Sequence, residues 1–145
     1  MIFNTQVCTT IEQSERLLAL GLKKETTDMT LVSFDDTTIM ELIGQTSVSR
    51  ATIKINGTEV QTEDLRHIPA WSLHRLIAMI PKWCKKEYYF HISGREVHYR
   101  LNGTTEYGIS HYSFWEKENL YGNIIDCIEW LIKENHFNKQ YLNES

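Results

Sequence analysis

The sequence predicts an α+β domain, in which a small antiparallel sheet, built as a hairpin-connected meander, is covered on one face by helices. Two hairpin turns near the middle of the chain and an amphipathic helical pattern toward each end predict this fold class. With 145 residues, the chain is long enough for one hydrophobic core. We expect a single domain over residues 1–137 and a flexible polar tail over residues 138–145.

The first helix is expected to begin after Thr10, because Thr10 and Gln13 have the spacing of a capping box. Gly21 is expected to end this helix in a Schellman motif, with Leu22 folding back on Leu17. The apolar stripe between the two ends consists of Ile11, Leu17, Leu18 and Leu20. A stripe of this kind predicts that the helix packs on a core.

Extended segments are expected next along the chain. Residues 29–34 have the composition of a strand, and residues 51–60 fit a hairpin around Asn56-Gly57. Residues 37–43 fit either a short helix that ends at Gly44 or a second strand, and the pattern leaves both interpretations open.

Two further helices are expected on either side of the central sheet. The first should have Pro69 as its first helical residue and end before Pro81, since proline is tolerated at a helix start but not in its interior. The second should begin after Asn119, a good N-cap residue. The apolar faces of these helices contain Leu73, Leu76, Ile77 and Ile80 in the first, and Leu120, Ile124, Cys127, Ile128 and Leu131 in the second. The polar face of the second, expected in water, contains Asp126, Glu129, Lys133 and Glu134.

The hairpin turns of residues 87–107 predict which side chains share a face of the sheet. A two-residue turn at Gly94-Arg95 places His91 opposite His98, and a second turn at Asn102-Gly103 places Tyr107 on the other side of His98. One face is therefore polar and aromatic, with Tyr89, His91, His98, Arg100 and Tyr107. The opposite face is suited to a core and contains Tyr88, Phe90, Ile92, Val97, Tyr99 and Leu101.

The polar sheet face has the chemical inventory of a nucleotide site. The tyrosines can stack on a planar ring, while Arg100 and a protonated histidine can neutralise a phosphate or a carboxylate. The plainer interpretation is a solvated sheet face, whose cross-strand pairs stabilise the hairpin without binding anything.

A second candidate is the basic segment after Pro81, with Trp83 among Lys82, Lys85 and Lys86. Lysines around an indole can hold phosphates while the ring stacks on a base. Arg66, His67 and Arg75 are expected near the other end of the preceding helix and could extend this cluster. The alternative is a solvated basic loop with Trp83 packed inward.

The sequence contains no motif for catalysis or for a cofactor, so a non-enzymatic protein without a cofactor is expected. His91 and His98 are too few to hold a metal ion, and completing a site would need His111 or Glu96. We therefore assign no metal site. The lysines beside Cys84 favour a lowered thiol pKa there, but no nucleophile elbow surrounds this cysteine.

Composition and charge restrict the class of partner. A formal net charge of −4 gives no general attraction to the phosphates of duplex nucleic acid. No apolar run is long enough to span a membrane, and Met1 to Gln6 lacks the pattern of a signal peptide. Three widely separated cysteines, Cys8, Cys84 and Cys127, suggest reduced and mostly buried thiols. These observations predict a protein of the reducing cytoplasm.

Three segments resemble short uncharacterised proteins of bacteriophages and mobile elements of gut Bacteroidales: Cys8-Thr9-Thr10-Ile11-Glu12-Gln13-Ser14, Ile68-Pro69-Ala70-Trp71-Ser72-Leu73, and the helix from Asn119-Leu120 to Trp130-Leu131. The resemblance implies an accessory protein that acts on host defence or regulation, and some phage proteins of this size sequester cyclic or ADP-ribose-derived nucleotides.

Two hypotheses of function follow from the residues and the resemblance. The first is a homo-oligomer that binds a small anionic, nucleotide-like ligand through Tyr89 or Tyr107 and Arg100, with Lys85 or Lys86 from a neighbouring loop. The second is a protein-interaction module that contacts a host protein through the same sheet face, or through the regions around Trp71 and Trp115, since exposed aromatic residues dominate interface energetics.

Overall fold

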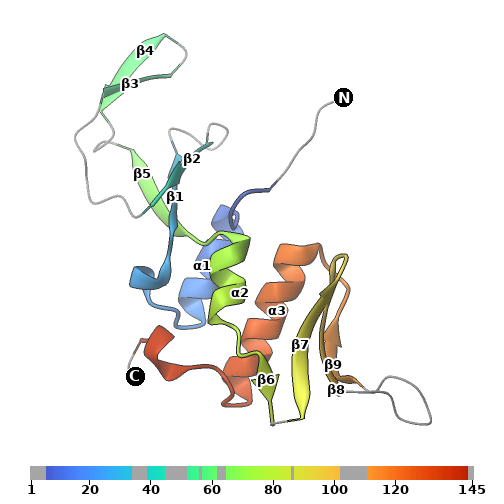
Figure 1. Ribbon diagram of the computed structural model, residues 1–145. Coiled ribbons are helices and arrows are strands. Elements are labelled where there is room, and N and C mark those ends of the chain that lie inside the picture. Colours follow the sequence, from blue (N-terminus) through green and yellow to red (C-terminus); the bar gives the residue numbers. More distant parts are fainter. Residues whose placement is uncertain are drawn as a thin grey trace.

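The computed structural model describes residues 6–33, 39–44, 52–55, 57–61, 65–85, 87–101 and 111–143, and it has the predicted α+β fold. The α-helices of these residues are α1 (Ile11–Ala19), α2 (Leu73–Met79) and α3 (Leu120–Lys133). Helix α3 lies between α1 and α2 on one side and a four-stranded sheet on the other (Figure 1). Among the described residues, no helix combines the length and the apolar character needed to cross a membrane.

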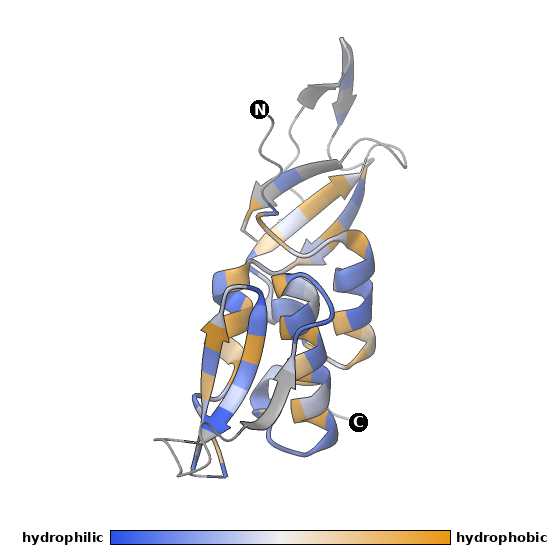
Figure 2. Ribbon diagram, turned by 90° about the vertical axis from the view of Figure 1, so that its right-hand side faces the viewer, coloured by the Kyte–Doolittle hydropathy of each residue, from blue (hydrophilic) through white to orange (hydrophobic). Residues whose placement is uncertain are grey.

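The four-stranded sheet is an antiparallel meander in the order β6-β7-β8-β9. Its strands are β6 (Trp83–Cys84), β7 (Tyr88–Ser93), β8 (Glu96–Leu101) and β9 (His111–Trp115). Apolar and polar residues alternate along β7 and β8 (Figure 2). The predicted register of the first hairpin is confirmed, because His91 pairs with His98 and Tyr89 pairs with Arg100. The predicted inner face is confirmed as well, since Val97 and Tyr99 are fully buried against the helices.

The prediction for the third strand of this meander was wrong. The residue opposite His98 on the far side of β8 is Phe114, and β8 pairs with β9 rather than with a strand through Tyr107. Trp115 at the end of β9 packs against Trp130 of α3, with ring centroids 5.5 Å apart. This packing favours His111–Trp115 as the partner of β8 over the predicted strand through Tyr107. Tyr107 and the Asn102-Gly103 turn lie outside the described residues.

A three-stranded antiparallel sheet, in the order β2-β1-β5, lies beyond α1 and α2. Its strands are β1 (Met29–Ser33), β2 (Ile39–Ile43) and β5 (Arg66–Ala70). Of the two interpretations of residues 37–43, the strand is therefore the one observed over Ile39–Ile43. A separate hairpin of β3 (Thr52–Ile55) and β4 (Thr58–Gln61) projects away from the helices (Figure 1). This hairpin forms around Gly57, as its turn residues predicted.

Pro69 belongs to β5 and not to the start of α2, which corrects the sequence prediction. Pro69 pairs with Thr30 in an edge strand, where a missing backbone N–H is tolerated. The N-cap of α2 is Ser72, whose Oγ accepts a hydrogen bond from the backbone N–H of Arg75 at 3.1 Å. The helix is therefore only seven residues long.

Both ends of α1 form as predicted. Gln13 and Thr10 form the reciprocal capping box. At the other end, the backbone N–H of Leu22 donates to the carbonyl of Leu17 at 3.2 Å, and Gly21 has a φ of +104°, as a Schellman motif requires.

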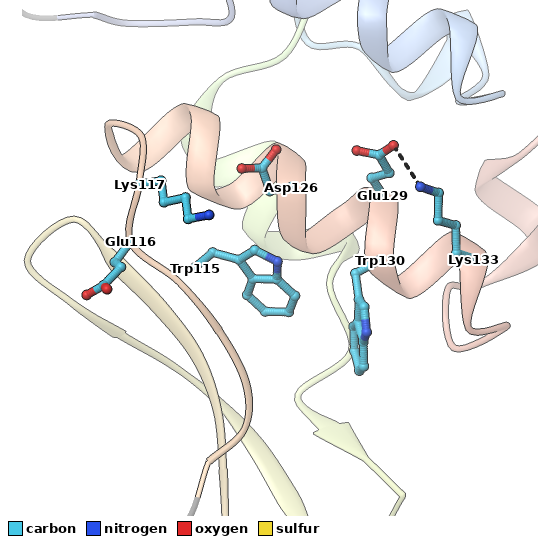
Figure 3. Close-up of a pocket in the computed structure, with 7 residues that line it drawn as sticks. All are labelled: Trp115, Glu116, Lys117, Asp126, Glu129, Trp130 and Lys133. Atoms are coloured by element: carbon cyan, nitrogen blue, oxygen red, sulfur yellow. Dashed lines mark ion pairs between the residues drawn. The ribbon is translucent and has the colours of Figure 1, made fainter.

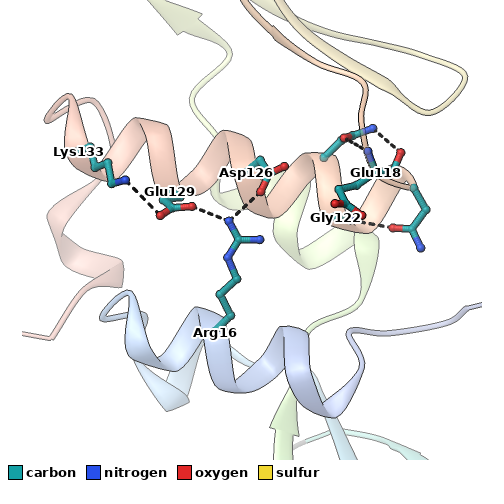
Figure 4. A network of polar contacts seen from close by, with 8 residues as sticks. Arg16, Glu118, Gly122, Asp126, Glu129 and Lys133 are labelled. Atoms are coloured by element: carbon teal, nitrogen blue, oxygen red, sulfur yellow. Dashed lines mark hydrogen bonds and ion pairs between the residues drawn. The ribbon is translucent and has the colours of Figure 1, made fainter.

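The sequence predicted that the polar face of α3 lies in water, but part of this face contacts α1. The same guanidinium nitrogen of Arg16, on α1, pairs with Asp126 at 2.7 Å and with Glu129 at 2.5 Å (Figure 4). Glu129 also pairs with Lys133 at 3.3 Å. These ion pairs join α1 to α3 along the side of α3 that the sheet does not cover.

Residues 138–143 were expected to fray and are instead anchored. Lys139–Tyr141 forms a short 3₁₀ helix, and the carbonyl of Tyr141 accepts a hydrogen bond from the backbone N–H of Lys23 at 2.8 Å. The N–H of Asn143 donates to the carbonyl of Gly21 at 2.7 Å. Both bonds join main-chain groups, so they hold this segment whatever the polarity of its side chains.

Candidate functional site

Trp83 is the first notable feature of the outer sheet surface. It lies in the short edge strand β6, and 51% of its surface is exposed. The next residue, Cys84, points the other way and is buried in the core. Because successive side chains of a strand point to opposite faces, burial of Cys84 keeps the Trp83 indole outside. The interpretation in which Trp83 packs inward is therefore wrong.

Trp83 belongs to a row of rings that crosses the outer face of the sheet. The ring centroids of Trp83 and Tyr89 are 5.9 Å apart, those of Tyr89 and His91 are 6.1 Å apart, and those of His91 and His98 are 6.2 Å apart. Arg100 pairs with Tyr89 across β7 and β8 and so lies on the same face. The two clusters that the sequence suggested separately, one around Trp83 and one along the hairpin, are thus one continuous surface.

Burial differs along this row. Tyr89, His91 and Arg100 are half-buried, whereas His98 is only 8% exposed and its Nε2 lies 3.2 Å from a carboxylate oxygen of Glu96. His98 is therefore too buried to contact a ligand directly, whereas Tyr89 and His91 are accessible. Lys86 and Tyr107, two other residues of the predicted site, lie outside the described residues.

An open groove of about 700 Å³ begins where the row meets the sheet edge. Small-molecule sites have volumes of roughly 300–1,000 Å³ and mostly apolar walls. The groove matches both properties, because α2 and the sheet contribute apolar side chains, and Lys82 contributes the only formal charge among the described lining residues. The lining residues are Ile77, Ala78, Ile80, Lys82, Trp83, Tyr89 and Phe90.

The segment that carries Lys82 and Trp83 is held in place by the sheet. The hydroxyl of Tyr99, a fully buried residue of β8, donates to the carbonyl of Pro81 at 2.6 Å. The backbone N–H of Phe90 donates to the carbonyl of Lys82 at 2.8 Å. One wall of the groove is thus fixed before any ligand arrives, which lowers the entropic cost of binding.

Lys82, which lines the groove, and Lys85, which follows strand β6, are both exposed. The predicted extension of this cluster by other basic residues is not observed. Arg66 pairs with Glu15 of α1 at 2.8 Å, and the Nε of Arg75 donates to the carbonyl of Thr26 at 2.7 Å. Arg66 therefore connects β5 to α1, and Arg75 connects α2 to the backbone at Thr26.

Comparison of the chain with known protein families, with characterised proteins and with solved structures gave no match.

The cysteines are buried, and burial sets their chemistry. Burial raises the pKa of the Cys84 thiol, and the opposing effect of Lys85 is smaller, so the lowered pKa that the lysines suggested is not found. Burial also raises the pKa of Cys8 to about 11 and that of Cys127 well above its usual value. No group of three metal-ligating side chains gathers within the described part of the chain.

Sequence reasoning misjudged two tryptophans. Trp71, whose region was one of the candidate interfaces of the second hypothesis, is fully buried, and its indole N–H donates to the hydroxyl of Thr26 at 2.9 Å. Trp130 was not considered, yet it forms a second pocket together with Trp115. Its position on α3, next to the stripe that begins at Leu120, was the only signal, and such a position is equally typical of core packing.

Proposed function

We propose that the protein acts by binding, as a phage-type accessory protein, and that it sequesters a small planar anion of the nucleotide class in the groove beside Trp83. The observation that carries the proposal is the half-exposed indole of Trp83, paired with Tyr89 at the mouth of a mostly apolar groove that also contains Lys82. A base or a similar ring lies against the two aromatic side chains, and its phosphate meets the lysine.

The physical argument rests on what each part of the site contributes. Stacking of a base on an aromatic side chain contributes about 1–3 kcal/mol and tolerates different bases. Lys82 attracts an anionic group, and Lys85, two residues after Trp83, adds positive charge to the same segment of the chain. The apolar side chains of Ile77 and Ile80 exclude water from the ring once it is bound.

Binding of a host protein is the second candidate. It is favoured by Ile43, which is 92% exposed at the end of β2, an edge strand of the three-stranded sheet. An edge strand offers backbone N–H and C=O groups for pairing with another chain. The same edge would serve the homo-oligomer that we expect from the sequence.

A thermal-shift panel tests the first candidate. Mono-, di- and cyclic nucleotides and cyclic ADP-ribose isomers are added to the protein, and a selective ligand raises the melting temperature by mass action. The Trp83→Ala variant should lose most of this rise, because it loses a stacking surface, while its melting temperature without ligand should change little.

Lys139→Ala is the matched control, since Lys139 is an exposed lysine of the C-terminal 3₁₀ helix and not of the groove. It should keep the full rise. If no nucleotide raises the melting temperature, or if Trp83→Ala responds as the parent does, the proposed site is wrong. A partner protein captured through β2, and lost on an Ile43→Asp change, would then favour the second candidate.

A further inference from the structure

A second concave site lies between α3 and the turn that follows β9 (Figure 3). Its volume is about 450 Å³, within the usual range for small-molecule sites. Among the described residues, its lining shares none with the groove beside Trp83. The lining residues are Trp115, Glu116, Lys117, Asp126, Glu129, Trp130 and Lys133.

Two indole rings form the aromatic part of this pocket. The centroids of Trp115 and Trp130 are 5.5 Å apart, with an angle of 60° between the rings. Trp130 is held from behind by Tyr99, at 6.1 Å, and by His136, at 5.7 Å. Both tryptophans are only partly buried, so the pocket presents a rigid aromatic wall that water can reach.

The charged groups around the two indoles are balanced. Three acidic residues line the pocket, and they are matched by two lining lysines together with Arg16, which pairs with Asp126 and Glu129 from α1. The formal charges therefore sum to zero. A phosphate would meet carboxylates here, and an organic cation would meet Asp126 and Glu129, which already have cationic partners.

A hydrogen-bond donor and a hydrogen-bond acceptor nevertheless line the pocket beside the aromatic wall. Lys117 reaches from the turn toward Asp126 and Trp115, so an ammonium donor and a carboxylate acceptor lie near the same indole (Figure 3). A ligand that uses both needs an acceptor and a donor close together, and neighbouring hydroxyl groups supply both without adding charge. A ligand that also covers an indole must have an apolar face.

We propose that this pocket binds a sugar unit, a neutral ring with an apolar C–H face and a rim of hydroxyl groups. The C–H face lies on Trp115, and the hydroxyl groups bond to Lys117 and Asp126. Direct protein contacts hold Trp130, and the site is independent of the groove beside Trp83. The protein would thus recognise a glycan or a glycosylated molecule, separately from any nucleotide.

Ligand-observed saturation-transfer NMR on the full chain tests the proposal, with D-glucose, D-galactose, N-acetyl-D-glucosamine and lactose as probes. At least one sugar should receive saturation, most strongly at its ring C–H protons. Lys117→Ala and Trp115→Ala should each weaken its binding about tenfold, which corresponds to about 1.4 kcal/mol. Circular dichroism of each variant checks that the fold is kept.

Trp83→Ala is the control, since it removes the other site and should leave sugar binding unchanged. Lys117 is exposed, so its variant keeps the test decisive even if Trp115→Ala does not fold. The proposal is overturned if none of the four sugars binds, if Lys117→Ala binds as the parent does, or if only tetramethylammonium, added as a cationic probe, occupies the pocket. Failure here leaves the nucleotide proposal untouched, because that proposal depends on different residues.

Discussion

Replacement of Arg16 by methionine should weaken the joint between α1 and α3. One guanidinium nitrogen of Arg16 bonds to carboxylates of both Asp126 and Glu129, which are one helical turn apart on α3. Methionine keeps much of the aliphatic stem and removes only the charge and the hydrogen bonds. The change therefore isolates the electrostatic part of the contact.

The expected magnitude follows from the exposure of the three side chains. Arg16 is 40% exposed, and Asp126 and Glu129 are each 30% exposed, so water screens both pairs. Pairs of this kind contribute about 0.2–1 kcal/mol each. Since both share one nitrogen, we expect a combined loss of about 1 kcal/mol, or roughly 3 °C in melting temperature for a chain of this length.

The loss should depend on pH with a definite sign. The hydrogen bond to Arg16 lowers the pKa of Glu129, so this carboxylate stabilises the fold above its unfolded pKa of about 4.3. That contribution disappears as the pH falls through the lower folded pKa. Parent and Arg16→Met proteins should therefore differ most near pH 7 and converge toward pH 3.

Differential scanning calorimetry at several pH values measures this difference. Lys133→Ala is the control, because the exposed Lys133 contacts only one oxygen of Glu129, at 3.3 Å, and its loss should be smaller. Equal stability of Arg16→Met and the parent at pH 7 would refute the electrostatic joint. A difference that stays constant down to pH 3 would show that packing, and not charge, is responsible.

Three further predictions concern buried groups. Tyr99→Phe should cost about 1–3 kcal/mol in urea unfolding, because the carbonyl of Pro81 loses its donor; Tyr89→Phe, on the outer face, should cost less. Asn123→Ala should cost at least about 2 kcal/mol in the same assay, since its amide bonds to backbone groups of Glu118 and Arg95; a near-neutral result would contradict this network. Ellman's reagent at pH 8 should label no thiol until the protein unfolds. The free energy of unfolding should fall above about pH 9, because only the thiols of the unfolded chain ionise there. Rapid labelling of the native state would contradict the raised pKa values of Cys8, Cys84 and Cys127.

The features that the sequence predicted well are those determined by neighbours in the chain. The capping box at Thr10 and the Schellman ending at Gly21 each involve a few consecutive residues. The register of β7 and β8 follows from one tight turn at Gly94, so His91 could be placed opposite His98 without knowledge of the rest of the fold.

The features that the sequence did not predict depend on distant contacts. Pro69 has a strong local preference for a helix start, yet pairing with β1 places it in an edge strand. The partner of β8 is β9, whose Trp115 packs on Trp130 of α3, a contact between distant residues that the local pattern does not show.

The candidate site shows the same limit. The sequence showed the cluster around Trp83 and the cluster along the β7–β8 hairpin, but it did not show that the two form one surface. Strand β6 has only two residues, too few for an alternating pattern to show which way Trp83 points. Its contact with Tyr89 appears only once β6 pairs with β7.

The indole N–H resonances of the four tryptophans offer the most direct test of binding beside Trp83. Each gives one peak in a two-dimensional ¹H–¹⁵N spectrum, assigned by single Trp→Phe variants. When the nucleotide selected by the thermal-shift panel is added, the Trp83 peak should move and saturate, while the peak of the buried Trp71 stays in place. A titration in which the Trp83 peak does not move, or in which only the Trp115 and Trp130 peaks move, would contradict the account.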